Sequence, residues 1–163
     1  MMGRALLIVG AAATLGLAAS AVLGYLLQGP VGTEMSRHVL VALASCLLLL
    51  FSHCWIMFYL IGTGKAIKEA VNEHKLDPDL IEETKRYKNR SYPSLMLAMA
   101  LAMATFILGG GAATGTLPVW IHHVLFWAAL VAQVRALWIE KGVLDANERL
   151  MADIDRRLAK ERP

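Results

Sequence analysis

The 163-residue sequence is poor in charged residues and in cysteine. Charged residues make up 18% of the chain, against about a quarter in soluble domains, and 57% is hydrophobic. This balance excludes a soluble enzyme and a disordered chain. The two cysteines, Cys46 and Cys54, would lie about 12 Å apart along one helix, too far for a disulfide bond. A disulfide scaffold is therefore excluded as well.

The motifs of common catalytic sites are also absent. The chain contains no phosphate-binding loop, dinucleotide fingerprint, nucleophile elbow, HExxH or CxxC motif. No carboxylate falls within its long apolar runs, which argues against proton transport through an Asp/Glu relay. No inverted repeat or broken helix of the kind found in transporters is visible. We therefore do not expect an enzyme with an independent catalytic activity.

Four apolar runs are each long enough to cross a bilayer, which takes about 20 helical residues. We expect an all-α, integral membrane four-helix bundle, a single domain over residues 1–163, in contact with lipid. Arg4 and the small residues at 18–21 also resemble a secretory signal, whose cleavage would leave three spans. The apolar run continues to Leu27, which favours an uncleaved helix. The expected spans cover residues 5–27, 37–62, 93–113 and 117–138.

Basic residues gather on one side of these spans. Seven lie between the second and third spans and six in the C-terminal tail, whereas the two opposite loops hold only Arg37. The positive-inside rule then places both termini in the cytoplasm, and we expect a multi-pass protein of the cell inner (plasma) membrane. The anionic lipids of the inner leaflet would attract these basic residues and account for the positive charge of the chain. We therefore expect no nucleic-acid binding.

The polar segments follow a helical periodicity. Residues 63–92 are predicted to form a helical hairpin that reverses at Lys75–Asp77, with Asp77 as an N-cap. Residues 139–161 are predicted to continue the last span as a cytoplasmic C-terminal helix. Helices two, three and four would thus extend into the cytoplasm. The extension either stiffens the bundle or docks a cytoplasmic protein partner.

Apart from Arg37 and Arg135 near their ends, the expected spans contain no Lys, Arg, Asp or Glu, and histidines are the residues there that ionise near neutral pH. Ionisable residues inside a span mark a functional site by default. His38 and His122 lie near the outer ends of the second and fourth spans, on faces with small or polar neighbours. We expect them to meet inside the bundle and to be the metal ligands. His123 shares its face with bulky apolar residues and is expected to face lipid, although it remains a candidate for cofactor binding.

His53 lies fifteen residues beyond His38, about 22 Å deeper along the same helix, and cannot share a ligand with the outer pair. We expect its neighbours to be the third-span methionines Met96, Met99 and Met103, because histidine and methionine together suit haem iron or copper. The alternatives are that the methionines fill gaps in the core and that His53 is a satisfied structural residue.

Two histidines on one helix and a third on another resemble, in outline, the di-haem four-helix core of b-type membrane cytochromes. The resemblance rests on the spacing of His38 and His53 alone. The gap is fifteen residues, not two heptads, and Ala136 and Leu137 stand where a second ligand on the fourth span is expected.

Two main hypotheses follow. The leading one is a haem b or metal-binding redox module for electron transfer, with ligands from helices two and four and with His53 at a second, inner site or a quinone contact. The alternative is a cofactor-free accessory or assembly subunit of a larger membrane complex, which docks partners through its cytoplasmic helices. A small channel or metal transporter ranks third. The smooth face of Gly16, Ser20 and Gly24 could also pair two copies in a homodimer.

Overall fold

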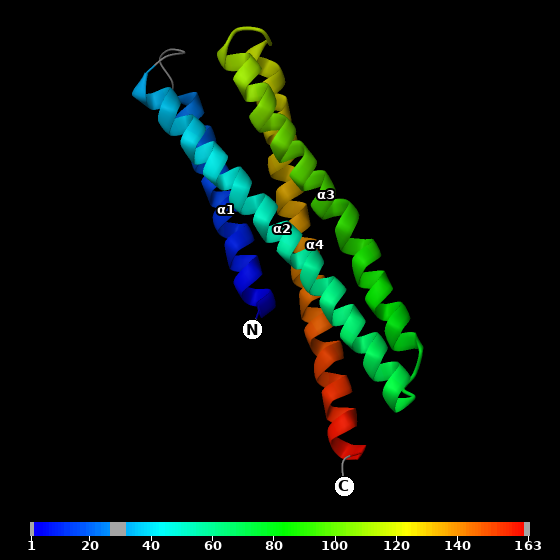
Figure 1. Cartoon of the computed structure of the whole chain (residues 1–163). Helices are drawn as coiled ribbons and strands as arrows, with labels where there is room; N and C mark the ends of the chain where they lie inside the picture. The colour runs from blue at the N-terminus through cyan, green and yellow to red at the C-terminus, as the bar shows by residue number, and fades with distance from the viewer. Residues whose placement is uncertain (1, 27–31, 162–163) are drawn as a thin grey trace.

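The computed structural model describes residues 2–26 and 32–161, and Figure 1 shows the whole chain. It is all-α, and within the described residues everything outside the helices is turn or loop. All four helices are long and apolar enough to cross a membrane, which indicates a multi-pass membrane protein. The helices are α1 (Met2–Tyr25), α2 (Thr33–His74), α3 (Asp79–Ala113) and α4 (Val119–Glu161).

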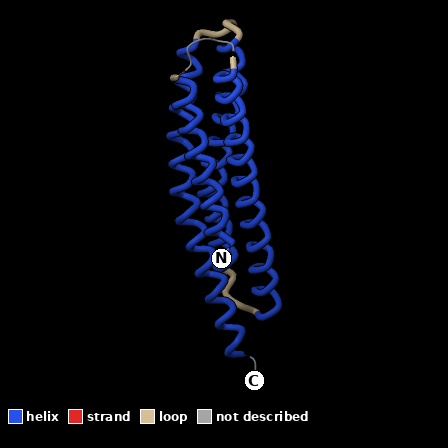
Figure 2. The backbone as a smooth tube through the Cα atoms, turned by 90° about the vertical axis from the view of Figure 1, so that its left-hand side faces the viewer, coloured by secondary structure: helices blue, strands red, loops and turns tan. Residues whose placement is uncertain are grey.

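The bundle consists of two antiparallel hairpins, α1–α2 and α3–α4. Helices α2 and α4 lie at the centre, since each contacts the other three, whereas α1 and α3 do not contact each other. The hairpins diverge toward the end where α1 connects to α2, which we call the pocket end (Figure 1). At the opposite end α2, α3 and α4 continue beyond the N-terminus of α1 (Figure 2). We call this extension, residues 63–92 and 147–159, the stalk.

Large apolar side chains cover the outside of the membrane part. Trp138 is 80% exposed and Phe58 is 69% exposed, an arrangement that water would penalise and that lipid covers. The interior is closely packed, with Leu49, Ile56 and Leu95 completely buried. Hydrophobic side chains therefore face both inward and outward, as expected of helices in a bilayer.

The small residues of α1 are used within the chain. A side chain at Gly16 would collide with Ser45 of α2, and Ser20 is buried. A Cβ at Gly24 would lie 2.9 Å from His38 Cε1. Small residues let two helix backbones approach closely, and here they do so for α1 and α2. Because α2 already covers this face, it is not available to pair two copies, contrary to the expectation from the sequence.

The stalk has an apolar core of its own. Helix α2 ends at His74, and Lys75 adopts a left-handed conformation with φ of 51°. Asp77 Oδ1 then accepts a hydrogen bond from the Asp79 backbone N–H at 3.0 Å, which satisfies one free donor at the start of α3. Helices α2, α3 and α4 thus bury their apolar faces against one another in the stalk, without a contribution from the described residues of α1. The buried residues of this core are Ile67, Val71, Leu80, Leu150 and Ile154.

Candidate functional site

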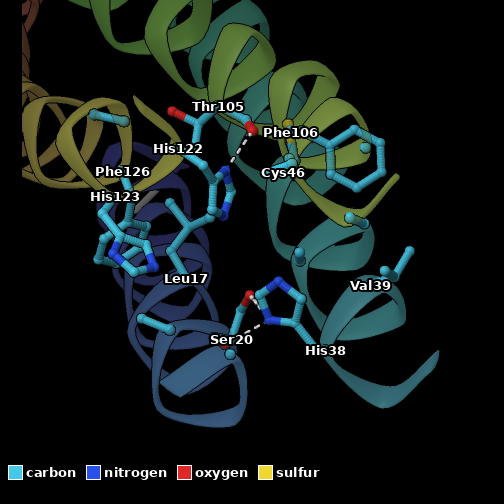
Figure 3. A pocket seen from close by; sticks show the side chains of 18 of the residues that line it. Leu17, Ser20, His38, Val39, Cys46, Thr105, Phe106, His122, His123 and Phe126 are labelled. Carbon is cyan, nitrogen blue, oxygen red and sulfur yellow. Dashed lines mark hydrogen bonds between the residues drawn. The ribbon is translucent and has the colours of Figure 1, made fainter. Parts of the chain in front are cut away.

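A cavity of about 620 Å³ opens between the two hairpins at the pocket end (Figure 3). Its volume falls within the roughly 300–1,000 Å³ range of small-molecule and cofactor sites. All four helices contribute to its walls, which are mostly aliphatic and aromatic. Such a site fixes a ligand through a few placed polar groups. The polar groups here are Ser20, Tyr25, His38, Thr105, His122 and His123.

His38 projects from the first turns of α2 and is held by the facing helix α1. Its Nδ1–H donates to the backbone carbonyl oxygen of Ser20 at 2.8 Å, and the Ser20 hydroxyl lies 3.4 Å from the same nitrogen. The residue one turn further along α1 is Gly24, whose missing side chain leaves room for the imidazole ring. The carbonyl bond fixes the Nδ1–H tautomer, so the lone pair lies on Nε2.

His122 is held in the same way by the second hairpin. Its Nδ1–H donates to the carbonyl oxygen of Thr105 on α3 at 3.1 Å. The residue one turn further along α3 is Gly109, and a Cβ there would lie 2.8 Å from His122 Cε1. His122 therefore also keeps its Nε2 lone pair. Within the described part of the chain, the Nε2 atoms of His38 and His122 have no hydrogen-bond partner.

The two hairpins thus repeat one local design. In each, a hydroxyl residue is followed by glycine four positions later, and the histidine comes 13 or 14 positions after that glycine. A carbonyl in a helix has two lone pairs, so it can accept from the imidazole in addition to its helical bond. This pattern of a hydroxyl residue, glycine and histidine is present in the sequence. The search for functional motifs did not find it, because its spacing matches none of the common metal-ligand motifs. Its members are Ser20, Gly24 and His38 in one hairpin and Thr105, Gly109 and His122 in the other.

The two imidazoles face each other across the cavity (Figure 3). Their ring centroids are 6.4 Å apart and their planes are at 89°. A metal–imidazole bond is about 2.0–2.1 Å long, so two rings that bind one metal from opposite sides have centroids about 6 Å apart. The sequence predicted that His38 and His122 would meet, and the structure brings their rings together across the cavity.

His123 also lines the cavity. Its ring centroid lies 5.1 Å from that of Tyr25 on α1. The expectation that His123 faces lipid is wrong. Its face of α4 lines the cavity between the hairpins, and Tyr25 of α1 lies against it. His123 lines the pocket next to His122, with the two ring centroids 6.2 Å apart.

His53 lies outside this cavity and has partners that the sequence pattern did not predict. Its Nδ1 is 2.5 Å from Glu140 Oε1 and its Nε2 is 2.8 Å from Gln133 Oε1, so both partners come from α4. The expectation that His53 lies next to methionines of α3 is wrong. Met96 and Met103 are about half exposed, and Met99 lies against the sulfur of Cys54 instead.

Glu140 is a buried carboxylate that hydropathy placed outside the spans. It lies two residues beyond the expected fourth span, 117–138, yet it is completely buried and level with His53, which is well inside the expected second span. The contact between Thr63 and Asn147 shows the same register further along the two helices. Glu140 therefore belongs to the buried interior of the bundle, although it follows the run 117–138 that hydropathy assigns to the fourth span.

No known protein family, curated protein or solved structure matches the chain. Among the described residues, no group of three or more His, Cys, Asp or Glu side chains is placed to hold a metal ion. The function is therefore argued from the pair of facing imidazoles and from the buried His53–Glu140 pair.

Substitutions at two glycines, Gly109 on α3 and Gly62 on α2, provide a test of how His122 is held. Gly109→Ala should push the imidazole away from the Thr105 carbonyl. Gly62→Ala on α2 should be silent, since a Cβ at Gly62 meets no atom of the described residues within 4 Å and Gly62 does not line the cavity. Loss of such an outer hydrogen bond typically costs about 10–100-fold in metal affinity. Haem is the ligand that the sequence predicts for this pair of histidines, and titration of both purified variants with haem should then show weaker binding for Gly109→Ala alone. Equal affinities would contradict this account of the ring's position.

Proposed function

We propose that the pocket binds haem b with His38 and His122 as axial ligands, and that the protein is a redox module for electron transfer in a membrane. The observation that carries the proposal is the pair of facing imidazoles 6.4 Å apart, each with Nδ1 held by a helix carbonyl and with Nε2 free. Outer hydrogen bonds of this kind set the tautomer and raise the basicity of metal-binding histidines.

The number of available ligands favours haem over a bare metal ion. A structural or catalytic zinc site takes three or four protein ligands, and the described residues contain no such group. A porphyrin would itself supply four of the iron's nitrogen ligands, so one or two protein side chains would be enough to hold the iron. Two histidines in a large, mostly apolar cavity suit the porphyrin.

The chain's own residues would position and enclose the group. His38 and His122 come from different hairpins, so a shared ligand would tie α1–α2 to α3–α4 where they diverge. Phe106 and Phe126 are among the apolar residues that line the cavity and limit access of water. When bound, haem supplies one-electron oxidation and reduction, and the surrounding polarity and axial ligands set its potential.

The absorption spectrum of the purified protein tests this proposal. Protein from cells supplied with haem should show a Soret band that shifts on reduction with dithionite, with about one haem per chain since there is one facing pair. A colourless preparation that also fails to bind added haem would reject the proposal. Zinc and copper, added separately, serve as controls for binding of a bare ion.

We also propose that the stalk and both termini lie in the cytoplasm, with the pocket near the outer face of the plasma membrane. The support is the concentration of lysine and arginine in the stalk and the C-terminal tail, and the single basic residue, Arg37, at the pocket end. The stalk is then the part that a cytoplasmic protein partner would contact. A reporter enzyme active only in the cytoplasm, fused to the C-terminus, should be active.

A further inference from the structure

A buried chain of polar side chains crosses the bundle between the pocket and the stalk. His53, Gln133 and Glu140 are each 0% exposed. The Gln133 amide nitrogen donates to the Thr14 hydroxyl at 3.2 Å, and that hydroxyl donates to the Gly10 carbonyl at 2.8 Å. Burying ionisable groups in the membrane part is costly, and such groups are by default functional.

The hydrogen bonds of His53 determine how many protons the His53–Glu140 pair carries in this structure. Both nitrogens of His53 face acceptor oxygens, that of Glu140 and that of Gln133. Nε2–H must therefore donate to the Gln133 oxygen, and a second proton must lie between Nδ1 and Glu140 Oε1. The second proton gives either imidazolium with carboxylate or neutral imidazole with a protonated acid. In both cases the pair carries two protons and no net charge.

In a second arrangement, with one proton fewer, both nitrogens of His53 still have hydrogen-bond partners. If the Gln133 amide turns by 180°, its N–H group donates to a deprotonated Nε2 of His53. The amide oxygen then faces Thr14, whose hydroxyl can turn to donate to it. Nδ1–H still donates to the Glu140 carboxylate. Rotation of one amide and one hydroxyl thus gives both nitrogens of His53 a partner in either state, while the second oxygen of Glu140 has none among the described residues in either.

We propose that His53 and Glu140 form a proton-binding site that exchanges one proton, with Gln133 as the positioning residue that pairs with His53 Nε2 in both states. The step is the loss of H⁺ from His53 Nε2 to water, which leaves neutral imidazole beside the Glu140 carboxylate; the reverse step restores the neutral pair. No bond other than N–H breaks and no electron is transferred.

Within the described residues, the surroundings of the pair hold two buried polar atoms without partners, and an apolar cluster separates the pair from the pocket. The second oxygen of Glu140 is buried without a partner in the described structure, as is the amide nitrogen of Asn147 seven residues further toward the stalk. No other titratable or charged group among the described residues interacts with His53 or Glu140. Toward the pocket, an apolar cluster of α1, α2 and α3 intervenes: Ala13, Cys46, Leu49 and Ala102. The site therefore does not depend on the proposed haem.

Side-chain nitrogen NMR of the full-length protein tests the proposal. Protein labelled with ¹⁵N-histidine and embedded in lipid bilayers without haem is titrated from mildly acidic to mildly alkaline pH, and the His53 signals are assigned by their loss in His53→Gln. We expect two protonated ring nitrogens at the acidic end and one at the alkaline end. Two protonated nitrogens at every pH, or one at every pH, would overturn the proposal.

Two variants on α4 sharpen the experiment. Glu140→Gln removes the carboxylate that balances the imidazolium, so His53 should keep one protonated nitrogen throughout and the titration should be lost. Asp145→Asn changes an exposed carboxylate of the same helix and should leave the titration unchanged. An unchanged titration in a folded Glu140→Gln protein would overturn the proposal. If that variant does not fold, the wild-type titration alone decides.

Discussion

His122→Ala protein purified from cells supplied with haem is expected to have lost the Soret band of the wild type. The substitution removes one of two axial ligands and also leaves the Thr105 carbonyl without its imidazole donor. Loss of an outer-shell partner alone costs about 10–100-fold in metal affinity, and loss of the ligand costs more. The haem retained per chain, measured as the pyridine haemochrome, should fall at least about tenfold.

The local repeat of the two hairpins gives this experiment its controls. His38→Ala should cause the same loss, because His38 occupies the matching position on the other hairpin. His74→Ala should retain the wild-type spectrum, since His74 is exposed at the end of α2. His123→Ala, which changes the wall of the pocket but not the facing pair, should retain haem with a shifted band. Retention of a wild-type spectrum by both His38→Ala and His122→Ala would contradict the ligand assignment.

Composition and helical faces were sufficient to predict the all-α four-helix bundle and the meeting of His38 with His122. Each of these histidines shares a helix face with small or polar residues, and such faces are buried in the structure, as Ser45 on α2 and Ala129 on α4 illustrate. The face of a helix follows from the period of 3.6 residues, which is a local property of the sequence. This is why the pairing was predictable.

The partners of His53 depended on the register between helices, which no single helix reveals. Hydropathy ended the fourth span at 138, because Glu140 and Lys141 follow directly. In the structure Glu140 turns inward to His53 and is completely buried, while Lys141 is exposed. The position of His123 was misjudged for a related reason. Its neighbours on α4 are bulky, but α1 places Tyr25 against it.

Glu140→Ala is expected to destabilise the bundle more than any surface substitution. His53 would remain fully buried with its Nδ1 facing an empty space, and breaking a buried pair by removing one partner costs about 3–5 kcal/mol. The free energy of unfolding, measured by denaturant titration in mixed micelles, should fall by that amount. Asp145→Ala breaks an exposed pair with Lys141 on the same helix and should cost less than about 1 kcal/mol.

A double substitution distinguishes two contributions of His53 and Glu140 to stability: their polar interaction with each other and the packing of their side chains. His53→Leu together with Glu140→Leu replaces both polar groups by apolar ones, which removes the orphaned donor as well as the buried charge. Replacing both members of a buried ion pair by apolar residues is often neutral or stabilising. The double variant should therefore lose about 1–3 kcal/mol less of its free energy of unfolding than the sum of the losses in the single variants His53→Leu and Glu140→Leu. Additive costs would show that His53 and Glu140 contribute independently, in which case they hold α2 against α4 by volume alone.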